Sequence, residues 1–271
     1  MPDHWNKHAQ QWQWIASPLR PAPEDIQLLK AALRRWHAAI SRPSLQAVLL
    51  GVTPEIALME WPRGTRLVAI DRSKAMIRAI WPGAQLGHAA LCAEWSNLPL
   101  PPASEDIVVG DGCFSTLVTR DEYRAAVRAV RRILRGGGIF LMRFFIRPDV
   151  AEPVDRVFDD LLNARIGDFH AFKWRLAMAL QMSSASGVRQ QEIWQAWSHA
   201  AIDPSRLPQP GWSGRAVSTI DLYEGKEARL YFPTVREFTA LMAEAYTDIE
   251  VRYPTYELGE RCPIIAARPR T

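Results

Sequence analysis

The sequence contains few cysteines. Among its 271 residues only Cys92, Cys113 and Cys262 carry a thiol, and they lie far apart. An odd number of cysteines at these spacings gives neither a disulfide framework nor the paired C-x-x-C pattern of a zinc site. We therefore expect no metal in this protein.

Long apolar runs are also missing. No window approaches the 18 or more uncharged apolar residues that a membrane helix needs. The first residues, MPDHWNKHAQQWQW, have neither a basic n-region nor an apolar h-region. The sequence thus predicts a cytoplasmic protein without a membrane partner.

Runs of like charge are absent as well. The net charge is +4 and the pI is about 9.1, but Lys, Arg, Asp and Glu are interspersed along the chain. This pattern argues against nucleic acid as a partner. The 48% of hydrophobic and 23% of charged residues are typical of a soluble globular protein. The length suits one large domain, or one domain with an insertion.

Short apolar runs alternate with helical patterns between residues 24 and 147. Strands are expected at 47–50, 66–70, 89–93, 106–110 and 138–145, and helices at 24–39, from Thr53, at 72–80 and at 123–134, with Gly136 to Gly138 ending the last helix. Strands separated by helices pair in parallel through right-handed crossovers. The predicted fold class is α/β, doubly wound and Rossmann-like, with a mostly parallel seven-stranded sheet.

The rest of the chain predicts an insertion followed by the end of the sheet. Residues 149–215 carry no strand pattern but three helical stretches, at 152–166, 170–182 and 189–199, so we interpret them as a helical lid over a substrate. A helix at 235–245 and strands at 248–253 and 262–267 follow. A short link near 257–260 suits an antiparallel hairpin. The expected domains are 1–148 (N-terminal segment and cofactor-binding core), 149–215 (lid) and 216–271 (completion of the core).

Polar residues stand where four successive strands end. They are Gly51 to Glu55, Asp71, Glu94 with Trp95, and Asp111 with Gly112. Ligands of open parallel sheets bind at the carboxyl ends of the strands. Asp71 follows Gly51 by about 20 residues, the spacing at which an acid reaches a ribose hydroxyl. Glu94 would accept a hydrogen bond from an exocyclic amine, so the set is suited to an adenosine.

The first of these turns, LLGVTPEIA, contains a single glycine. It is neither the G-x-G-x-x-G turn of a dinucleotide site nor a G-x-x-x-x-G-K-[ST] phosphate loop. The expected ligand is therefore an adenosine with little or no phosphate.

Each of these residues also has a purely structural interpretation. Gly51 would serve as a turn residue, Asp71 as a helix cap, Glu94 as a surface acid, Trp95 as a core aromatic, and Asp111 with Gly112 as an ordinary turn. Their occurrence at consecutive strand ends, in one order, favours a shared ligand over four independent coincidences.

The order LLGVTPE, VAID, AEWSNLPLPPASEDIVVGDG and LRGGGIFLMRFF resembles the class I S-adenosylmethionine-dependent methyltransferases, over residues 47–147 with a tail at 231–267. SNLPLPPASEDIVV is the most specific segment. The family's first motif usually has two or three glycines, whereas this chain has Gly51 followed by Val52 and Thr53. The resemblance implies S-adenosylmethionine as the cofactor. It implies Gly51 and Thr53 beside the methionine part, Asp71 at the ribose, Glu94 and Trp95 at the adenine, Arg72 and Met76 flanking them, and Asp111 with Gly112 at the fourth strand end.

Two further segments are expected to close the site. The N-terminal segment holds Trp5, Trp12 and Trp14, and would place Arg20 against the methionine carboxylate; alternatively it packs as a helix with Arg20 in solvent. The lid supplies aromatic residues for a small-molecule pocket or for its own core, namely Trp174, Trp194, Trp197 and Trp212, with Tyr223 and Tyr231 after it. His170 is a weak candidate for a catalytic base. Cys113, which has no basic neighbour in sequence, is more often inert than nucleophilic.

The leading hypothesis is methyl transfer from S-adenosylmethionine to an O, N or S nucleophile of a small molecule. The alternative, motivated by the single glycine, is a non-catalytic cofactor-binding or scaffolding protein that partners another enzyme. The expected partners are a small-molecule acceptor and either a second copy of the chain or a partner enzyme. Nucleic-acid methylation is the weakest hypothesis, because DGCF at residues 111–114 does not fit the [DNS]-P-P-[YFW] tetrapeptide that base amino methylation implies by family resemblance.

Overall fold

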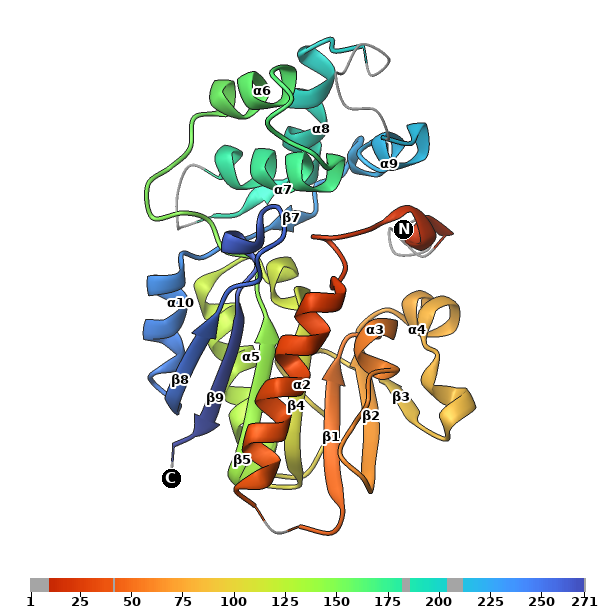
Figure 1. Ribbon diagram of the computed structural model, residues 1–271, viewed down its shortest axis with the longest axis vertical. Helices are drawn as coiled ribbons and strands as arrows, with labels where there is room; N and C mark the ends of the chain where they lie inside the picture. The colour runs from red at the N-terminus through yellow and green to blue at the C-terminus, as the bar shows by residue number, and fades with distance from the viewer. Residues whose placement is uncertain (1–9, 41, 182–185, 204–211, 271) are drawn as a thin grey trace.

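The computed structural model describes residues 10–40, 42–181, 186–203 and 212–270. Its centre is a seven-stranded sheet in the order β3-β2-β1-β4-β5-β9-β8 (Figure 1). The strands are β1 (Leu45–Leu50), β2 (Thr65–Asp71), β3 (Ala89–Cys92), β4 (Glu105–Asp111), β5 (Leu134–Arg143), β8 (Tyr246–Arg252) and β9 (Ile264–Pro269). The first five pair in parallel, and β9 lies antiparallel between β5 and β8. The predicted doubly wound α/β fold is confirmed.

Helices cover both faces of the sheet (Figure 1). They are α2 (Pro23–Ala38), α3 (Pro54–Ala57), α4 (Lys74–Ile80), α5 (Arg120–Ile133) and α10 (Val235–Met242). Successive residues of β1 face opposite sides of the sheet. Val48 packs in the apolar cluster that includes α5 and α10, and Leu49 packs in the apolar cluster that includes α2. Both side chains are fully buried, as expected for a parallel strand covered on both faces.

A mostly helical cap, which we define as the described part of residues 154–232, stands over the carboxyl ends of the parallel strands (Figure 1). It consists of α6 (Val154–Leu162), α7 (Phe169–Leu180), β6 (Val188–Arg189), α8 (Gln190–His199), α9 (Gly214–Ser218), the 3₁₀ turn η5 (Asp221–Tyr223) and β7 (Arg229–Leu230). The cap has its own apolar core, in which the Phe169 ring meets Trp197 and Trp212 edge-on at 5.4 Å between centroids.

The structure departs from the sequence predictions at three places. The stretch expected to hold no strand contains β6, which pairs antiparallel with β7 and is too short to produce an apolar run. Helix α5 passes directly into β5 at Leu134, so Gly136 to Gly138 lie inside the strand rather than ending the helix. The connection between β8 and β9 is longer than the predicted link and contains the 3₁₀ turn η6 (Gly259–Arg261).

No helix among the described residues is both long and apolar enough to span a membrane.

The close pairing of β6 with β7 generates a stability prediction. A Cβ at Gly187 would lie 2.0 Å from the carbonyl oxygen of Leu230, a backbone atom that cannot rotate away. Gly187→Ala is therefore expected to lower the free energy of unfolding by about 1–3 kcal/mol. Gly214→Ala, at a position with nothing within 4 Å, serves as the control and should change it by less than about 1 kcal/mol. Urea unfolding of both variants measures the difference, and equal stabilities would contradict the proposed packing.

Candidate active site between the sheet and the cap

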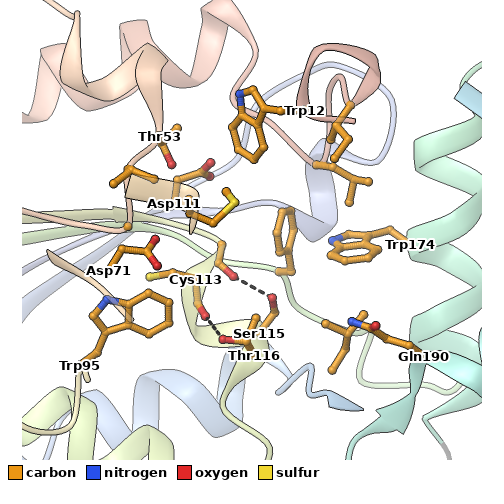
Figure 2. Close-up of a pocket in the computed structure, with 18 of the residues that line it drawn as sticks. Trp12, Thr53, Asp71, Trp95, Asp111, Cys113, Ser115, Thr116, Trp174 and Gln190 are labelled. Atoms are coloured by element: carbon orange, nitrogen blue, oxygen red, sulfur yellow. Dashed lines mark hydrogen bonds between the residues drawn. The ribbon is translucent and has the colours of Figure 1, made fainter. Parts of the chain in front are cut away.

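A pocket of about 900 Å³, including its open mouth, lies between the strand ends and the cap. Figure 2 places Asp71 and Trp95 on one side of it and Trp174 and Gln190 on the opposite side. The sheet contributes residues from the ends of β1, β2 and β4, the cap contributes α7, α8, η5 and β7, and the N-terminal segment contributes Trp12, Ile15 and Leu19. The pocket thus lies at the edge of the sheet where the sequence predicts a ligand.

Two glycines bring the backbone close to this pocket. Gly51 has φ +92°, and its amide donates to the carbonyl of Ile70 at 2.8 Å, joining the ends of β1 and β2. Gly112 has φ +59°, and a Cβ there would lie 2.3 Å from the Phe145 ring. Other residues rarely adopt these φ values, so both positions require glycine for conformation and Gly112 also for space.

Asp71 converges with Gly51, as their spacing predicted. Its Oδ1 accepts a hydrogen bond from the amide of Ser73 at 2.7 Å. Its Oδ2 lies 3.9 Å from the place that a Cβ at Gly51 would occupy. Burial raises the pKa of this carboxyl group, while the Ser73 hydrogen bond lowers it. Helix α4 is capped by Ser73, whose Oγ accepts a hydrogen bond from the Met76 amide at 3.3 Å. Asp71 is therefore not the side chain that caps this helix.

Trp95 forms a flat wall of the pocket. Its indole Nε1 donates to the Ile70 carbonyl at 2.8 Å, and only 4% of the residue is exposed. The ring is therefore fixed against the end of β2, close to Met76, which also lines the pocket. The Arg72 guanidinium lies 5.9 Å from the Trp95 ring but does not line the pocket.

Thr53 lines the pocket next to Gly51. It stands at the N-cap of α3, where a helix was expected to begin, and Pro54 occupies the first helical position, but the Thr53 side chain makes no capping hydrogen bond. Its hydroxyl therefore has no role in holding the helix end.

Besides Arg72, three site residues predicted from the sequence do not line the pocket. Glu94 is exposed beyond the end of β3. The Arg20 guanidinium binds Glu55 and lies 4.9 Å from the Trp12 ring, so it is not the solvent-exposed side chain of the alternative interpretation. His170 Nε2 donates to the carbonyl of Trp14 at 3.0 Å, since a carbonyl can only accept. Burial and nearby Lys173 lower the pKa of His170 to about 4. Its observed contact ties the N-terminal segment to the cap.

Asp111 lines the pocket at the end of β4, where it binds a buried arginine. Its Oδ1 accepts a hydrogen bond from Arg143 Nε at 2.5 Å. Burial raises the pKa of Asp111 to about 6, although Arg143 opposes the shift. Burial alone would lower the pKa of Arg143, but Asp111, Tyr256 and Asp25 together hold it well above its usual value.

The Arg143 guanidinium joins four parts of the chain. Its Nη1 donates to the carbonyl of Pro18 at 2.8 Å and to the Tyr256 hydroxyl at 3.2 Å, and lies 3.6 Å from an Asp25 carboxylate oxygen. The Tyr256 hydroxyl donates in turn to Asp25 at 2.9 Å. This network, which we call the Arg143 cluster, ties the N-terminal segment, α2, β5 and the β8–β9 connection to the Asp111 wall of the pocket.

Sequence reasoning missed the Arg143 cluster, although one signal was present. Arg143 is the single charged residue in the apolar run IFLMRFF. A charge inside a strand expected to be buried requires partners. Those partners, Asp25 and Tyr256, lie far away in sequence and have no motif that would identify them.

The remaining polar and aromatic candidates divide between pocket and core. Cys113 lines the pocket, and burial raises its pKa well above the usual value, which keeps it a thiol rather than a thiolate nucleophile. Trp174 and Tyr223 line the pocket, whereas Trp194, Trp197 and Trp212 pack in the cap and Tyr231 in the sheet core. Ser115, Thr116, Gln190 and Leu230 are lining residues that the sequence did not indicate. Trp5 lies outside the described residues.

Within the described part of the chain, no group of three or more His, Cys, Asp or Glu side chains is arranged to hold a metal ion.

Residues 50–142 match the family model described as a methyltransferase domain. That segment runs from the end of β1 to β5 and contains Gly51, Asp71, Trp95 and Asp111. This part of the chain is therefore similar to methyltransferase domains. No curated protein matches its sequence.

Solved structures of methyltransferases share the fold of this chain. The N-methyltransferase NodS from Bradyrhizobium japonicum, solved with S-adenosyl-L-homocysteine, aligns with a TM-score of 0.52 at 11% identity, over 99% of this chain and 100% of that one. A SAM-dependent methyltransferase from Methanosarcina mazei aligns with a TM-score of 0.50 at 14% identity, over 93% of this chain and 99% of that one.

A Rhodobacter sphaeroides protein provisionally named a zinc-dependent alcohol dehydrogenase aligns with a TM-score of 0.59 at 12% identity, over 100% of both chains. At these identities the likenesses concern the fold alone. The methyltransferase assignment therefore depends on the family match, which covers the strand ends that line the pocket.

The raised pKa of Asp111 generates a prediction about stability. This carboxyl group ionises at about 6 in the folded protein and at 3.8 as a free side chain. Between these values the folded state holds a proton that the unfolded chain has released. The stabilising contribution of Asp111 is therefore complete below pH 3.8 and is lost as the pH rises through about 6.

Asp111→Asn removes this titration. The variant's free energy of unfolding should fall less steeply between pH 4 and 6, by up to about 1.4 kcal/mol per pH unit, even though Arg143 loses one of its two carboxylate partners and the variant is less stable overall. Urea unfolding at a series of pH values measures both slopes. Asp121→Asn, at a carboxylate that is 89% exposed, should keep the wild-type slope. Parallel slopes for wild type and Asp111→Asn would contradict the pKa assignment.

Proposed function

We propose that this methyltransferase moves the methyl group of S-adenosylmethionine to an O, N or S nucleophile of a small molecule held between the sheet and the cap. The observation that carries the proposal is the convergence of Asp71 with the Gly51 turn inside the pocket of a matched methyltransferase domain. One Asp71 oxygen is occupied by Ser73, and the other faces the turn.

The charge of the pocket suits this cofactor. Among the described residues, the charged side chains that line it are Asp71 and Asp111, both acids. S-adenosylmethionine carries a sulfonium, an ammonium and a carboxylate, and therefore a net positive charge. Two acids, with no Lys or Arg among the described residues of the lining, favour such a cation over a nucleotide phosphate.

The residues present fit the parts of the cofactor. Asp71 would accept hydrogen bonds from the ribose, while Trp95 and Met76 offer a flat apolar surface to the adenine. The Gly51 and Gly112 turns allow close approach of backbone to the methionine part, and Asp111 would face its ammonium. The bound cofactor would supply an electrophilic methyl group to a nucleophile aligned with the carbon–sulfur bond.

The pocket favours acceptors that need little help from a base. Cys113 is held as a thiol, and Asp111 is engaged by Arg143. A neutral amine or a thiolate needs no proton removed at the transition state, whereas an unactivated alcohol usually does. The enzyme's contribution would be positioning and exclusion of water, through the cap above the strand ends and the N-terminal segment beside them.

Calorimetric titration with S-adenosylmethionine and S-adenosylhomocysteine tests the proposal. Asp71→Asn keeps an oxygen for the Ser73 amide but removes the charge that would hold the ribose. We expect its affinity for both ligands to fall by about 5- to 150-fold, which corresponds to about 1–3 kcal/mol. Unchanged affinity in the folded variant would reject the role of Asp71. No binding to the wild-type protein, purified without bound ligand, would favour the scaffolding alternative.

Glu94→Gln provides a comparison in the same titration. The family resemblance implies that Glu94 contacts the adenine amine, whereas the structure leaves this side chain exposed and outside the pocket lining. We expect the Glu94→Gln affinity to stay within about twofold of wild type, because an exposed hydrogen bond contributes little. A loss as large as that of Asp71→Asn would instead place Glu94 in the cofactor site.

A further inference from the structure

The two sides of the pocket differ in chemistry. Both lining acids, Asp71 and Asp111, stand at strand ends, on the side proposed for the cofactor. Opposite them, the cap presents the side chains of Trp174, Gln190, Tyr223 and Leu230, of which none is charged (Figure 2). The acceptor would lie against this second surface, which we call the cap wall.

Trp174 on α7 is held rigidly in the cap wall. Its ring meets Phe145 edge-on at 5.2 Å between centroids and Phe232 at 5.5 Å. The residue is only 5% exposed, yet its indole Nε1 is buried without a hydrogen-bond partner in the described structure. Figure 2 shows this nitrogen on the edge of the ring that faces the pocket.

Gln190, the first residue of α8, is held as firmly. Its backbone amide donates to the Ala228 carbonyl at 2.9 Å, next to the β6–β7 pair. The residue is 6% exposed, and within the described residues its Oε1 also lacks a hydrogen-bond partner. Its amide end points into the pocket (Figure 2).

These two atoms form a complementary pair. The indole nitrogen can only donate a hydrogen bond, and the amide oxygen can only accept one. Buried polar groups in native proteins are nearly always paired, and an exception calls for a functional explanation. Both atoms lie on a pocket wall, and a bound molecule with the opposite pair of groups would satisfy both.

We propose that the cap wall recognises a neutral, flat molecule that presents a hydrogen-bond acceptor to Trp174 Nε1 and an N–H or O–H donor to Gln190 Oε1, as an aromatic lactam or amide does. The aromatic neighbours Tyr223 and Phe145 supply the apolar surface for its ring. An anionic molecule is disfavoured because no cation lines the described wall. This inference rests on the proposed function and deepens it, since it describes the part of the methyl acceptor that the pocket recognises, with the accepting amine or thiolate as a separate group of that molecule.

Binding of matched probes to the protein loaded with S-adenosylhomocysteine tests the proposal. The probe 2-quinolone carries both groups, N-methyl-2-quinolone lacks the donor, 1,2,3,4-tetrahydroquinoline lacks the carbonyl, and quinoline-2-carboxylate is anionic. We expect 2-quinolone to bind about tenfold more tightly than each neutral analogue, since each loses one buried hydrogen bond, and the carboxylate to bind most weakly.

Two variants test whether Gln190 and Trp174 cause the preference for 2-quinolone over its neutral analogues. Gln190→Met should abolish the preference for 2-quinolone over its N-methyl derivative. Trp174→Phe should abolish the preference for 2-quinolone over tetrahydroquinoline. The matched controls Trp197→Phe, in the cap core, and Gln195→Met, on the exposed side of α8, should keep both preferences. Thermal unfolding of every variant establishes that it is folded.

The outcomes separate this inference from the proposed function. If the carboxylate binds most tightly, if N-methylation has no effect, or if no neutral probe binds wild-type protein at millimolar concentration, the cap-wall proposal is overturned. Titration with S-adenosylhomocysteine alone tests the proposed function independently. Probe selectivity in a protein that does not bind S-adenosylhomocysteine would support the cap wall while rejecting the methyl donor.

Discussion

The pairing of Arg143 with Asp111 is the interaction on which the site depends. A guanidinium without solvent exposure is tolerable only when carboxylates and hydrogen-bond acceptors surround it. Here those partners come from α2, the N-terminal segment, the end of β4 and the β8–β9 connection. The Arg143 guanidinium thus fixes Asp111 in the pocket wall and also holds these segments together. Site geometry and fold stability share one set of contacts.

The division of the pocket into two chemically different walls follows from its construction. Parallel strands end in turns, and these turns supply the acids and the glycines that let backbone approach a ligand. The cap supplies large apolar rings with one buried donor and one buried acceptor. A sheet similar to those of solved methyltransferases is therefore combined with a cap that presents an uncharged wall to the same pocket.

The sequence predicted what depends on local pattern. Strand ends are marked by Gly51, Asp71 and Asp111 because each polar residue directly follows an apolar run, and the structure brings all three to one pocket. Arg20 differs because its partner, Glu55, lies 35 residues away. The same holds for Gln190, whose place on the wall depends on how β6 and β7 pair. Such contacts arise from tertiary packing, which periodicity does not encode.

The position of β9 has a consequence for the order of folding. This strand follows the cap in the chain, yet it lies inside the sheet between β5 and β8, and the connection that precedes it supplies Tyr256 to the Arg143 cluster. During synthesis the whole cap emerges before the strand that completes the sheet. Contacts between residues this distant in sequence form slowly. The Arg143 cluster therefore becomes complete only after the β8–β9 connection has followed the cap, and a chain without β9 would leave one side of β5 unpaired.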